Sequence, residues 1–392
     1  MRPGTGLAPG MPTPERDGRA SAPSSFDSAV SRAAERRTRP LSVIAHPALG
    51  HRGANPYTWL LYSHVQTAGG VEVEEYRGRR LLRSRFDVLH VHWPEGHLNQ
   101  PSFADAVRRS ISRLGLMAWA RRRGTKIIWT VHNLHAHERL HPRLERWFWR
   151  RFLRSLDGYI SLTRAGAAEA LARFPELGRL PGFVVPAGHY RDAYGGAMDR
   201  HVARRALGIA LDARVFAFAG LIRPYKNVPE LVDAFARLVD RDAILVVAGE
   251  PKTSALAAQL EAAAKRDPRV RLHLRWIPDD EITTYLAAAD LVVLPYREIL
   301  NSGSAVLALS FDRPVLVPAR GSLSELQEQV GTEWVRTYSG ALSSSELSRA
   351  MTWAVESARL ESPDLSELEW PRIAAATLSA YRTVIGGEGS CE

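Results

Sequence analysis

The sequence predicts an α/β protein with two parallel sheets, each covered by helices on both faces. Apolar runs of strand length alternate with amphipathic helical runs from residue 41 to about residue 360, as in parallel strands joined by helical crossovers. A stretch rich in proline and glycine, 181–196, divides this series in two. With 392 residues, of which 45% are apolar, the chain is long enough to form a core in each half.

The first half is expected to hold short apolar strands separated by helices. Asn55 precedes Pro56 and should cap the helix that this proline begins. The expected strands are 41–46, 71–74, 87–92, 126–131 and 159–162, and the expected helices begin near Tyr57 and cover about 103–122, about 143–155 and a segment that ends at Phe174.

The second half repeats the alternation, with strands at 216–219 and 291–294 and a last helix at about 371–384. Residues 1–40 are rich in proline, glycine, serine and arginine and cannot bury apolar area, so we expect them to be disordered. The predicted organisation is a disordered leader at 1–40, a first domain at 41–188, a linker at 189–212, a second domain at 213–365 and a closing helix at 366–386.

The composition limits the class of partner. Lysine and arginine total 52 against 42 acidic residues, and the net charge of +10 favours nucleotide sugars, lipid diphosphates or a membrane surface. The arginines are scattered through helices and form no single basic tract, so nucleic acid is not expected. A single cysteine excludes a disulfide framework, and no apolar stretch approaches the roughly 20 residues of a spanning helix. The expected location is the cytoplasm, including the inner face of the membrane. The oligomeric state is not indicated.

Two loops have the composition of a phosphate site. The apolar run 291–294 is followed by Asn301, Ser302, Gly303 and Ser304 and then by a helical run, so these residues are expected to open a helix. Backbone N–H groups there have no intrahelical partner and carry roughly half a positive charge, which suits a phosphate. A capped helix without a ligand would have the same sequence.

The second loop follows the strand 216–219 and contains Arg223 and Lys226 ahead of an amphipathic helix. Both cations are therefore placed at the carboxyl end of a parallel strand, where open sheets bind their ligands. Because two such loops occur in one α/β half, we interpret them as a diphosphate-binding site and not as solvated surface loops without a ligand.

The chain resembles the GT-B glycosyltransferases, which bind a sugar nucleotide in the C-terminal of two Rossmann-like domains. The resemblance rests on residues 219–231, on 247–249, on the strand and turn around Pro295, and on Arg313-Pro314-Val315 followed by Glu325. It implies that Arg223, Lys226 and the turn of Ser302 to Ser304 hold the donor diphosphate, and that Glu325 contacts the donor ribose or sugar. A first-turn helix acid would explain Glu325 equally well.

One position departs from the large retaining members, which carry two glutamates before the Arg-Pro-Val segment. The first falls near Glu298, and the second falls on or beside Leu307, which cannot replace a carboxylate. Together with residues 90–95 and 130–134, this departure makes the chain most similar to the bacterial exopolysaccharide branch that includes β-1,4-mannosyltransferases using GDP-mannose.

The first half supplies candidates for acceptor binding and for the catalytic base. His92, Trp93 and Glu95 end the strand 87–92 at the edge that faces the cleft, and the loop containing His132 and Glu138 ends the next strand. An inverting transfer needs a base for the acceptor hydroxyl, and we expect Glu138, Glu95 or His132 in that order. The resemblance also allows His132 to contact the donor. The loop at Gly50 and Arg52 lies where GT-B enzymes admit the acceptor, so the predicted acceptor site comprises Gly50, Arg52, His92 and Trp93.

The loop with His132, His135 and His137 lacks the spacing and the further ligands of a zinc site, so no metal or other cofactor is expected. Arginines and aromatics alternate in 143–154, which suits a membrane interface or a buried helix with outward arginines.

The predicted function is metal-independent transfer of a sugar from a nucleoside diphosphate sugar, GDP-mannose first and a UDP-sugar next, to a hydroxyl acceptor. That acceptor would be a polyprenyl-linked glycan or a secondary metabolite. The alternatives are a sugar-nucleotide epimerase or hydrolase of the same fold and a non-catalytic binding protein. A Rossmann dehydrogenase is disfavoured, because no Gly-x-Gly-x-x-Gly follows the first strand of either half.

Overall fold

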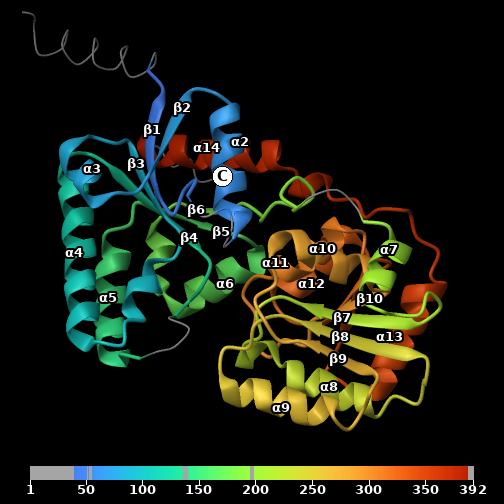
Figure 1. Ribbon diagram of the computed structural model, residues 1–392. Coiled ribbons are helices and arrows are strands. Elements are labelled where there is room, and N and C mark those ends of the chain that lie inside the picture. The colour runs from blue at the N-terminus through green and yellow to red at the C-terminus, as the bar shows by residue number, and fades with distance from the viewer. Residues whose placement is uncertain (1–38, 51, 53–54, 136–139, 195–197, 387–392) are drawn as a thin grey trace, which may run out of the picture. The chain divides into compact units, whose positions relative to one another are not determined.

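Two six-stranded parallel sheets with helices on their faces form the framework of the protein, and this confirms the predicted fold class (Figure 1). The computed structural model describes residues 39–50, 52, 55–135, 140–194 and 198–386. Residues from Leu41 onward belong to one compact unit. The expected disorder of the leader concerns residues outside the described part of the chain, except for 39 and 40.

The first sheet has the strand order β2-β1-β3-β4-β5-β6, and all its neighbouring strands run parallel. Asn55 caps α2 as predicted, because its Oδ1 accepts the Tyr57 N–H at 3.1 Å. The strands are β1 (Leu41–His46), β2 (Val71–Glu75), β3 (Val88–Val91), β4 (Lys126–Val131), β5 (Gly158–Ser161) and β6 (Gly182–Val184), and the helices are α2 (Pro56–Thr67), α3 (Gly78–Arg83), η1 (Pro94–Leu98), α4 (Phe103–Arg122), α5 (Pro142–Arg154), α6 (Arg164–Arg173) and η2 (Pro175–Arg179).

The second sheet has the order β12-β11-β10-β7-β8-β9. The chain proceeds from β7 outward to β9 and then crosses back to β10 on the other side of β7, so a crevice opens between the loops that follow β7 and β10. The strands are β7 (Arg214–Ala219), β8 (Ala243–Ala248), β9 (Val270–His273), β10 (Leu291–Val293), β11 (Val315–Pro318) and β12 (Val335–Tyr338), and the helices between and after them are η3 (Pro224–Lys226), α8 (Val228–Ala236), α9 (Ser254–Ala264), α10 (Asp279–Ala288), α11 (Gly303–Ser310), α12 (Ser322–Val330), α13 (Ser344–Glu356) and η4 (Ser366–Leu368).

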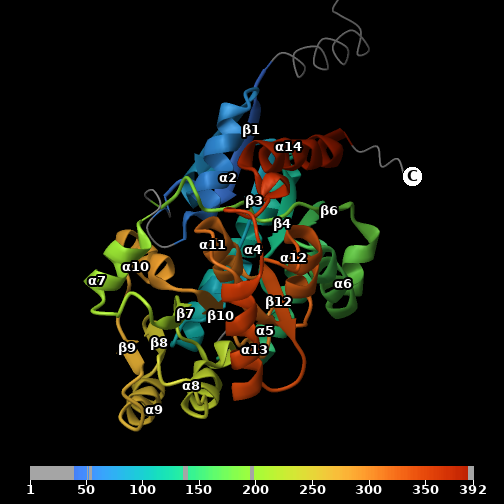
Figure 2. The ribbon, with the colours of Figure 1, turned by 90° about the vertical axis from the view of Figure 1, so that its right-hand side faces the viewer.

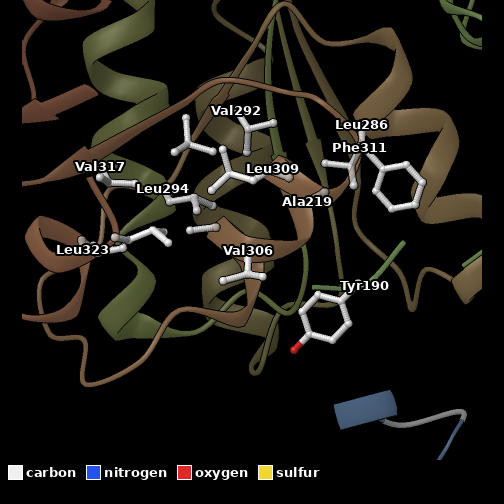
Figure 3. Packing of buried hydrophobic residues seen from close by; sticks show 14 of the residues in the cluster. Tyr190, Ala219, Leu286, Val292, Leu294, Val306, Leu309, Phe311, Val317 and Leu323 are labelled. Carbon is white, nitrogen blue, oxygen red and sulfur yellow. The ribbon is translucent and has the colours of Figure 1, made fainter. Parts of the chain in front are cut away.

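Packing beneath this crevice is dense. Figure 3 shows Val292 and Leu294 from the β10 segment beside Val306 and Leu309 of α11 and Val317 of β11. Every residue of β10 and β11 is buried. The loop between β10 and α11 is therefore held at both ends by a rigid core.

Two helices lie outside the alternating pattern. Helix α7 (Arg200–Ala206) falls within the predicted linker and packs on α10, with the buried guanidinium of Arg204 2.8 Å from Asp290. Helix α14 (Trp370–Gly386) returns to the first sheet and packs against α2 and β4 (Figure 2). Its Trp370 donates an indole N–H to the carbonyl of His189 at 2.7 Å.

Candidate active site

A cavity of about 290 Å³ opens at the carboxyl ends of β7 and β10. Two glycines shape its floor. Gly249 has a φ of +154°, and a Cβ there would lie 2.0 Å from the Gly220 carbonyl oxygen, so only glycine fits. Gly220 itself has a φ of +128°. The two strand ends can therefore approach closely and leave room above them for a ligand.

The first turn of α11 borders this cavity through Ser302, Gly303 and Ser304. Ser302 is the N-cap, and its Oγ accepts the Ala305 N–H at 3.1 Å. The N–H groups of Gly303 and Ser304 have no acceptor among the described residues. They are directed as an anion site requires, and the structure thus brings three predicted donor residues to one cavity.

Lys226 also borders the cavity, with its Nζ 5.7 Å from the ring centre of Tyr296 and 5.9 Å from that of Phe218. Burial, with a smaller effect of the positive Arg223, lowers the pKa of Lys226 to about 8. This buried ammonium between two aromatic rings forms no ion pair with a described residue and would gain an anionic partner from a diphosphate.

Arg223 is placed differently. Its guanidinium donates to the carbonyls of Ile222 and Glu250 at 3.1 and 3.2 Å, and the residue is not among those that line the cavity. Leu221 lines the cavity instead. Contact between Arg223 and the diphosphate therefore stays a prediction.

The side of the cavity near β9 contains Trp276, Ile277 and Asp279, which sequence reasoning missed. Trp276 is 46% exposed, although tryptophan is highly buried on average. Burial, and then the neighbouring Asp280, raise the pKa of Asp279. The sequence contained one signal for this side of the cavity, which is an aromatic residue in the loop that follows a strand of the second half.

A larger cavity of about 800 Å³ adjoins the 290 Å³ cavity, which we name the donor cavity after its predicted ligand. The larger cavity is lined by residues from both halves of the chain. Asn301 joins its two sides, because its amide donates to the carbonyls of Val131 and His132 at 3.3 and 3.4 Å. A third cavity of about 360 Å³ contains Glu298, the residue nearest the first glutamate of retaining relatives. Leu307, at the second position, lines the donor cavity with an apolar side chain.

His132 and Trp93 face the 800 Å³ cavity, with their rings stacked at 4.4 Å between centres. His92 is fully buried behind His132, and its Nδ1 lies 3.0 Å from the His132 Nε2. Burial lowers the pKa of His132 to about 3. Contact of His92 with an acceptor stays a prediction, since a ligand in this cavity meets Trp93 and His132 before it.

Glu95 is 3% exposed, and its Oε1 accepts the amide of Asn133 at 2.6 Å. Burial raises the pKa of Glu95 to about 7, against the opposing effect of the Asn133 hydrogen bond. Asn133 borders the cavity, so Glu95 reaches a ligand through this amide. Glu138, the first candidate for the base, lies outside the described residues, and its role stays a prediction.

Glu325 lines the 800 Å³ cavity, but both of its carboxylate oxygens are engaged. They accept the N–H groups of Arg164 and Ala165 at 3.0 Å each and so cap α6 from the other half of the chain. At the predicted acceptor loop, Gly50 donates its N–H to Glu75 at 2.9 Å, and the Arg52 guanidinium lies 4.3 Å from the ring centre of Trp59. The roles of Glu325, Gly50 and Arg52 in ligand binding stay predictions.

Within the described ranges, no group of three or more His, Cys, Asp or Glu side chains is arranged to hold a metal ion. The same part of the chain contains no helix with the length and apolar character needed to cross a membrane.

Two parallel sheets of this order, with a helix N-terminus and a lysine at the switch point of the second, define a sugar-nucleotide enzyme of the GT-B type. The family described as glycosyl transferases group 1 matches residues 213–356. The GDP-mannose:glycolipid 4-beta-D-mannosyltransferase of Xanthomonas campestris pv. campestris is 32% identical over 352 residues, which cover 89% of this chain and 94% of the relative.

The D-inositol 3-phosphate glycosyltransferase of Mycobacterium tuberculosis is 33% identical over 129 residues, covering 32% of this chain and 26% of the relative. Among solved structures, the sucrose-phosphate synthase of Thermosynechococcus elongatus superposes with a TM-score of 0.64 at 16% identity, covering 89% of this chain and all of the other. An Anabaena protein solved in complex with UDP-glucose superposes with a TM-score of 0.58 at 15% sequence identity. The superposition covers 88% of this chain and 98% of the other. The chain belongs to the group 1 glycosyltransferases, and the prediction of a GT-B glycosyltransferase is confirmed.

Proposed function

We propose that this enzyme transfers a mannosyl group from GDP-mannose to a hydroxyl group of a glycolipid. The observation that carries the proposal is the similarity to the Xanthomonas mannosyltransferase, which extends over 94% of that enzyme and therefore over both sheets. Because the acceptor half is included, the similarity bears on the glycolipid as well as on the nucleotide sugar. The proposed setting is exopolysaccharide assembly at the cytoplasmic face of the membrane.

The side chains near β9 support guanine as the base. Guanine presents N1–H and the N2 amino group side by side, and a carboxylate is the side chain that accepts both. Asp279 is a carboxylate in the donor cavity, beside the exposed ring of Trp276. Uracil offers a single ring N–H and cannot form the same pair of bonds.

The first turn of α11 and Lys226 would stabilise the leaving diphosphate, which supports transfer without a metal. Activity that persists in excess EDTA is the expected result. The base would take the proton of the acceptor hydroxyl, and Glu138 and Glu95 remain the candidates among the carboxylates.

Two neighbouring helices support a peripheral membrane contact. Helix α5 buries Phe148, Trp149 and Phe152 and turns its arginines outward, so the sequence alternative of a buried helix with outward arginines describes it better. Helix α4 exposes Phe103, Ile111 and Trp119 beside further arginines. Basic and apolar groups together suit an anionic lipid surface. Flotation with anionic vesicles and its loss with neutral vesicles would test the contact.

The test of the proposed function is product formation from GDP-mannose, UDP-glucose and UDP-N-acetylglucosamine with a glycolipid extract as acceptor. We expect mannosyl transfer that Asp279→Asn weakens through the KM for GDP-mannose. Sugar release without acceptor would favour the epimerase or hydrolase alternative. Nucleotide binding with no turnover under any condition would favour the non-catalytic alternative.

A further inference from the structure

A chain of buried hydrogen bonds leads from the core of the first sheet to the cavity at His132. The links are His132 Nε2 to His92 Nδ1 at 3.0 Å, His92 Nε2 to Tyr62 Oη at 2.7 Å, and Tyr62 Oη to His90 Nδ1 at 2.8 Å. His90 Nδ1 also lies 2.7 Å from Tyr381 Oη. His90 lies in β3, His92 and His132 directly follow β3 and β4, and α2 and α14 supply the tyrosines.

The surroundings of His90, His92 and His132 favour the neutral form of each imidazole. Burial and mutual repulsion lower the pKa of His90 to about 3 and that of His92 well below its usual range, and burial lowers that of His132 to about 3. A neutral imidazole has one N–H and one bare nitrogen. Each ring must therefore donate a hydrogen bond through one nitrogen and accept one through the other. Once the donor in one of these hydrogen bonds is known, the donors in the others follow.

His90 fixes the direction. Its Nδ1 touches two phenol oxygens, those of Tyr62 and Tyr381, and a bare nitrogen has a single lone pair that could accept from one of them only. One N–H can be shared by two oxygens, so Nδ1 carries the hydrogen. The His90 Nε2 is then bare and accepts the hydroxyl of Thr130 at 2.7 Å.

Tyr62 transmits this direction. Its oxygen accepts the N–H of His90, so its own hydrogen is left for Nε2 of His92, the second histidine in contact with its hydroxyl. His92 Nδ1 then donates to His132 Nε2. The remaining hydrogen of His132 is on Nδ1, which makes no hydrogen bond to a described residue.

We infer that His132 meets the substrate as a neutral hydrogen-bond donor through Nδ1–H, with Tyr62, His90 and His92 as positioning residues that fix this tautomer. The acceptor of this bond is an oxygen of the bound donor sugar or of its leaving diphosphate. This role rests on the proposed function, whereas the tautomer does not. The inference removes His132 from the candidates for the base, because a ring that presents N–H cannot take a proton at that atom.

The surroundings of His132 favour the neutral ring. Among the described residues, the aromatic and titratable groups around His132 are Tyr57 from α2, and His92 and Trp93 from the loop that follows β3. His46 and Tyr62 lie behind His92. No described carboxylate forms an ion pair with the ring. An imidazolium here would have no carboxylate partner in the described part of the chain.

The direct test is NMR of the full-length protein labelled with ¹⁵N-histidine, in which long-range ¹H–¹⁵N correlations show the ring nitrogen that carries the hydrogen. The His132 signals are assigned from their loss in His132→Asn. We expect a neutral Nδ1–H tautomer between pH 5.5 and 8. A bare Nδ1, or an imidazolium at pH 7, would overturn the inference and leave the mannosyl transfer proposal untouched.

Activity gives a second test, because asparagine places an N–H donor near the position of Nδ1 and glutamine places one near Nε2. We expect His132→Asn to retain kcat within about tenfold, and His132→Gln and His132→Ala to lose about a hundredfold, the usual effect of removing one donor from a reacting oxygen. Equal losses in the asparagine and alanine variants would indicate a base instead.

A pair of tyrosine variants tests the positioning residues. Tyr62→Phe removes the hydroxyl that donates to His92, so we expect a mixed His132 tautomer and a kcat about tenfold lower, with the GDP-induced rise in Tm unchanged. Tyr381→Phe removes one of the two phenol oxygens that keep the hydrogen on His90 Nδ1, so a mixed His132 tautomer is expected in this variant as well. A His132 spectrum that is unchanged from the wild type in both variants would refute the positioning role.

Discussion

Substitution of Lys226 by methionine should weaken GDP binding and remove its pH dependence. Methionine keeps the length and apolar contacts of the side chain between Tyr296 and Phe218 and removes only the charge. A charge-assisted hydrogen bond contributes about 1.5 to 3 kcal/mol, so the Kd for GDP should rise by about tenfold to a hundredfold.

The pH dependence follows from the lowered pKa of Lys226, about 8 in the free protein. A bound diphosphate favours the charged form and raises this pKa, so above pH 8 the complex holds more protons than the free protein. Affinity should therefore be nearly constant below the free pKa and fall by up to about tenfold per pH unit above it. The pH range in which the affinity changes begins at the pKa of Lys226 in the free protein and ends at its pKa in the complex.

Calorimetric titration with GDP at pH 7, 8 and 9, in two buffers of different ionisation enthalpy, measures both the Kd and the protons taken up. Lys265→Met is a matched control, because Lys265 is exposed at the end of α9 and outside the cavity. A wild-type Kd that is constant from pH 7 to 9, or a slope that persists in Lys226→Met, would refute the assignment of Lys226 to the diphosphate.

Three further changes test the site. The pKa of Glu95 is raised to about 7 in the folded state, so its contribution to stability is full below pH 4.5 and is lost as the pH rises to 7. Across this range the free energy of unfolding of the wild type, measured in urea, should fall by about 3 kcal/mol relative to Glu95→Gln. An equal pH dependence of the two proteins would contradict this. Gly249→Ala places a Cβ against the Gly220 carbonyl, so it should lower the free energy of unfolding by about 3 kcal/mol and abolish the GDP-induced rise in Tm. Gly208→Ala is the control, because Gly208 has a φ of +62° with open space around it, and its free energy of unfolding should fall by about 1 kcal/mol. Glu325→Gln weakens the cap of α6 and should lower the free energy of unfolding by about 1 kcal/mol with GDP binding intact; loss of GDP binding would favour the predicted donor contact.

Local signals in the sequence predicted the donor half well. The strand at 216–219 and the helix start at Ser302 to Ser304 were predicted correctly, because strand, turn and helix start are encoded within a few residues of one another. The cap at Asn55 was predicted for the same reason. Each of these features depends on backbone preferences that a short segment decides by itself. The role of Lys226 in donor binding stays a prediction.

Contacts between distant segments could not be predicted. Glu325 caps a helix 161 residues earlier in the chain, and Tyr381 bonds His90 across 291 residues. Arg223 has the right type and position for a diphosphate, yet its guanidinium turns to the carbonyls of Ile222 and Glu250, because the orientation of a long side chain is decided by the acceptors within its reach.

The charges around the donor cavity explain why few residues should dominate transfer. Lys226 is the one cation among the described residues that line this cavity, while the leaving nucleoside diphosphate carries at least two negative charges. Among the described residues, dipoles add to this charge: the N–H groups of the first turn of α11 and, by the inference above, the Nδ1–H of His132. Such groups are already oriented before the bond breaks, so they require no reorganisation as negative charge develops. Loss of one dipole should therefore lower kcat, while loss of the single cation should also weaken binding of the ground-state donor.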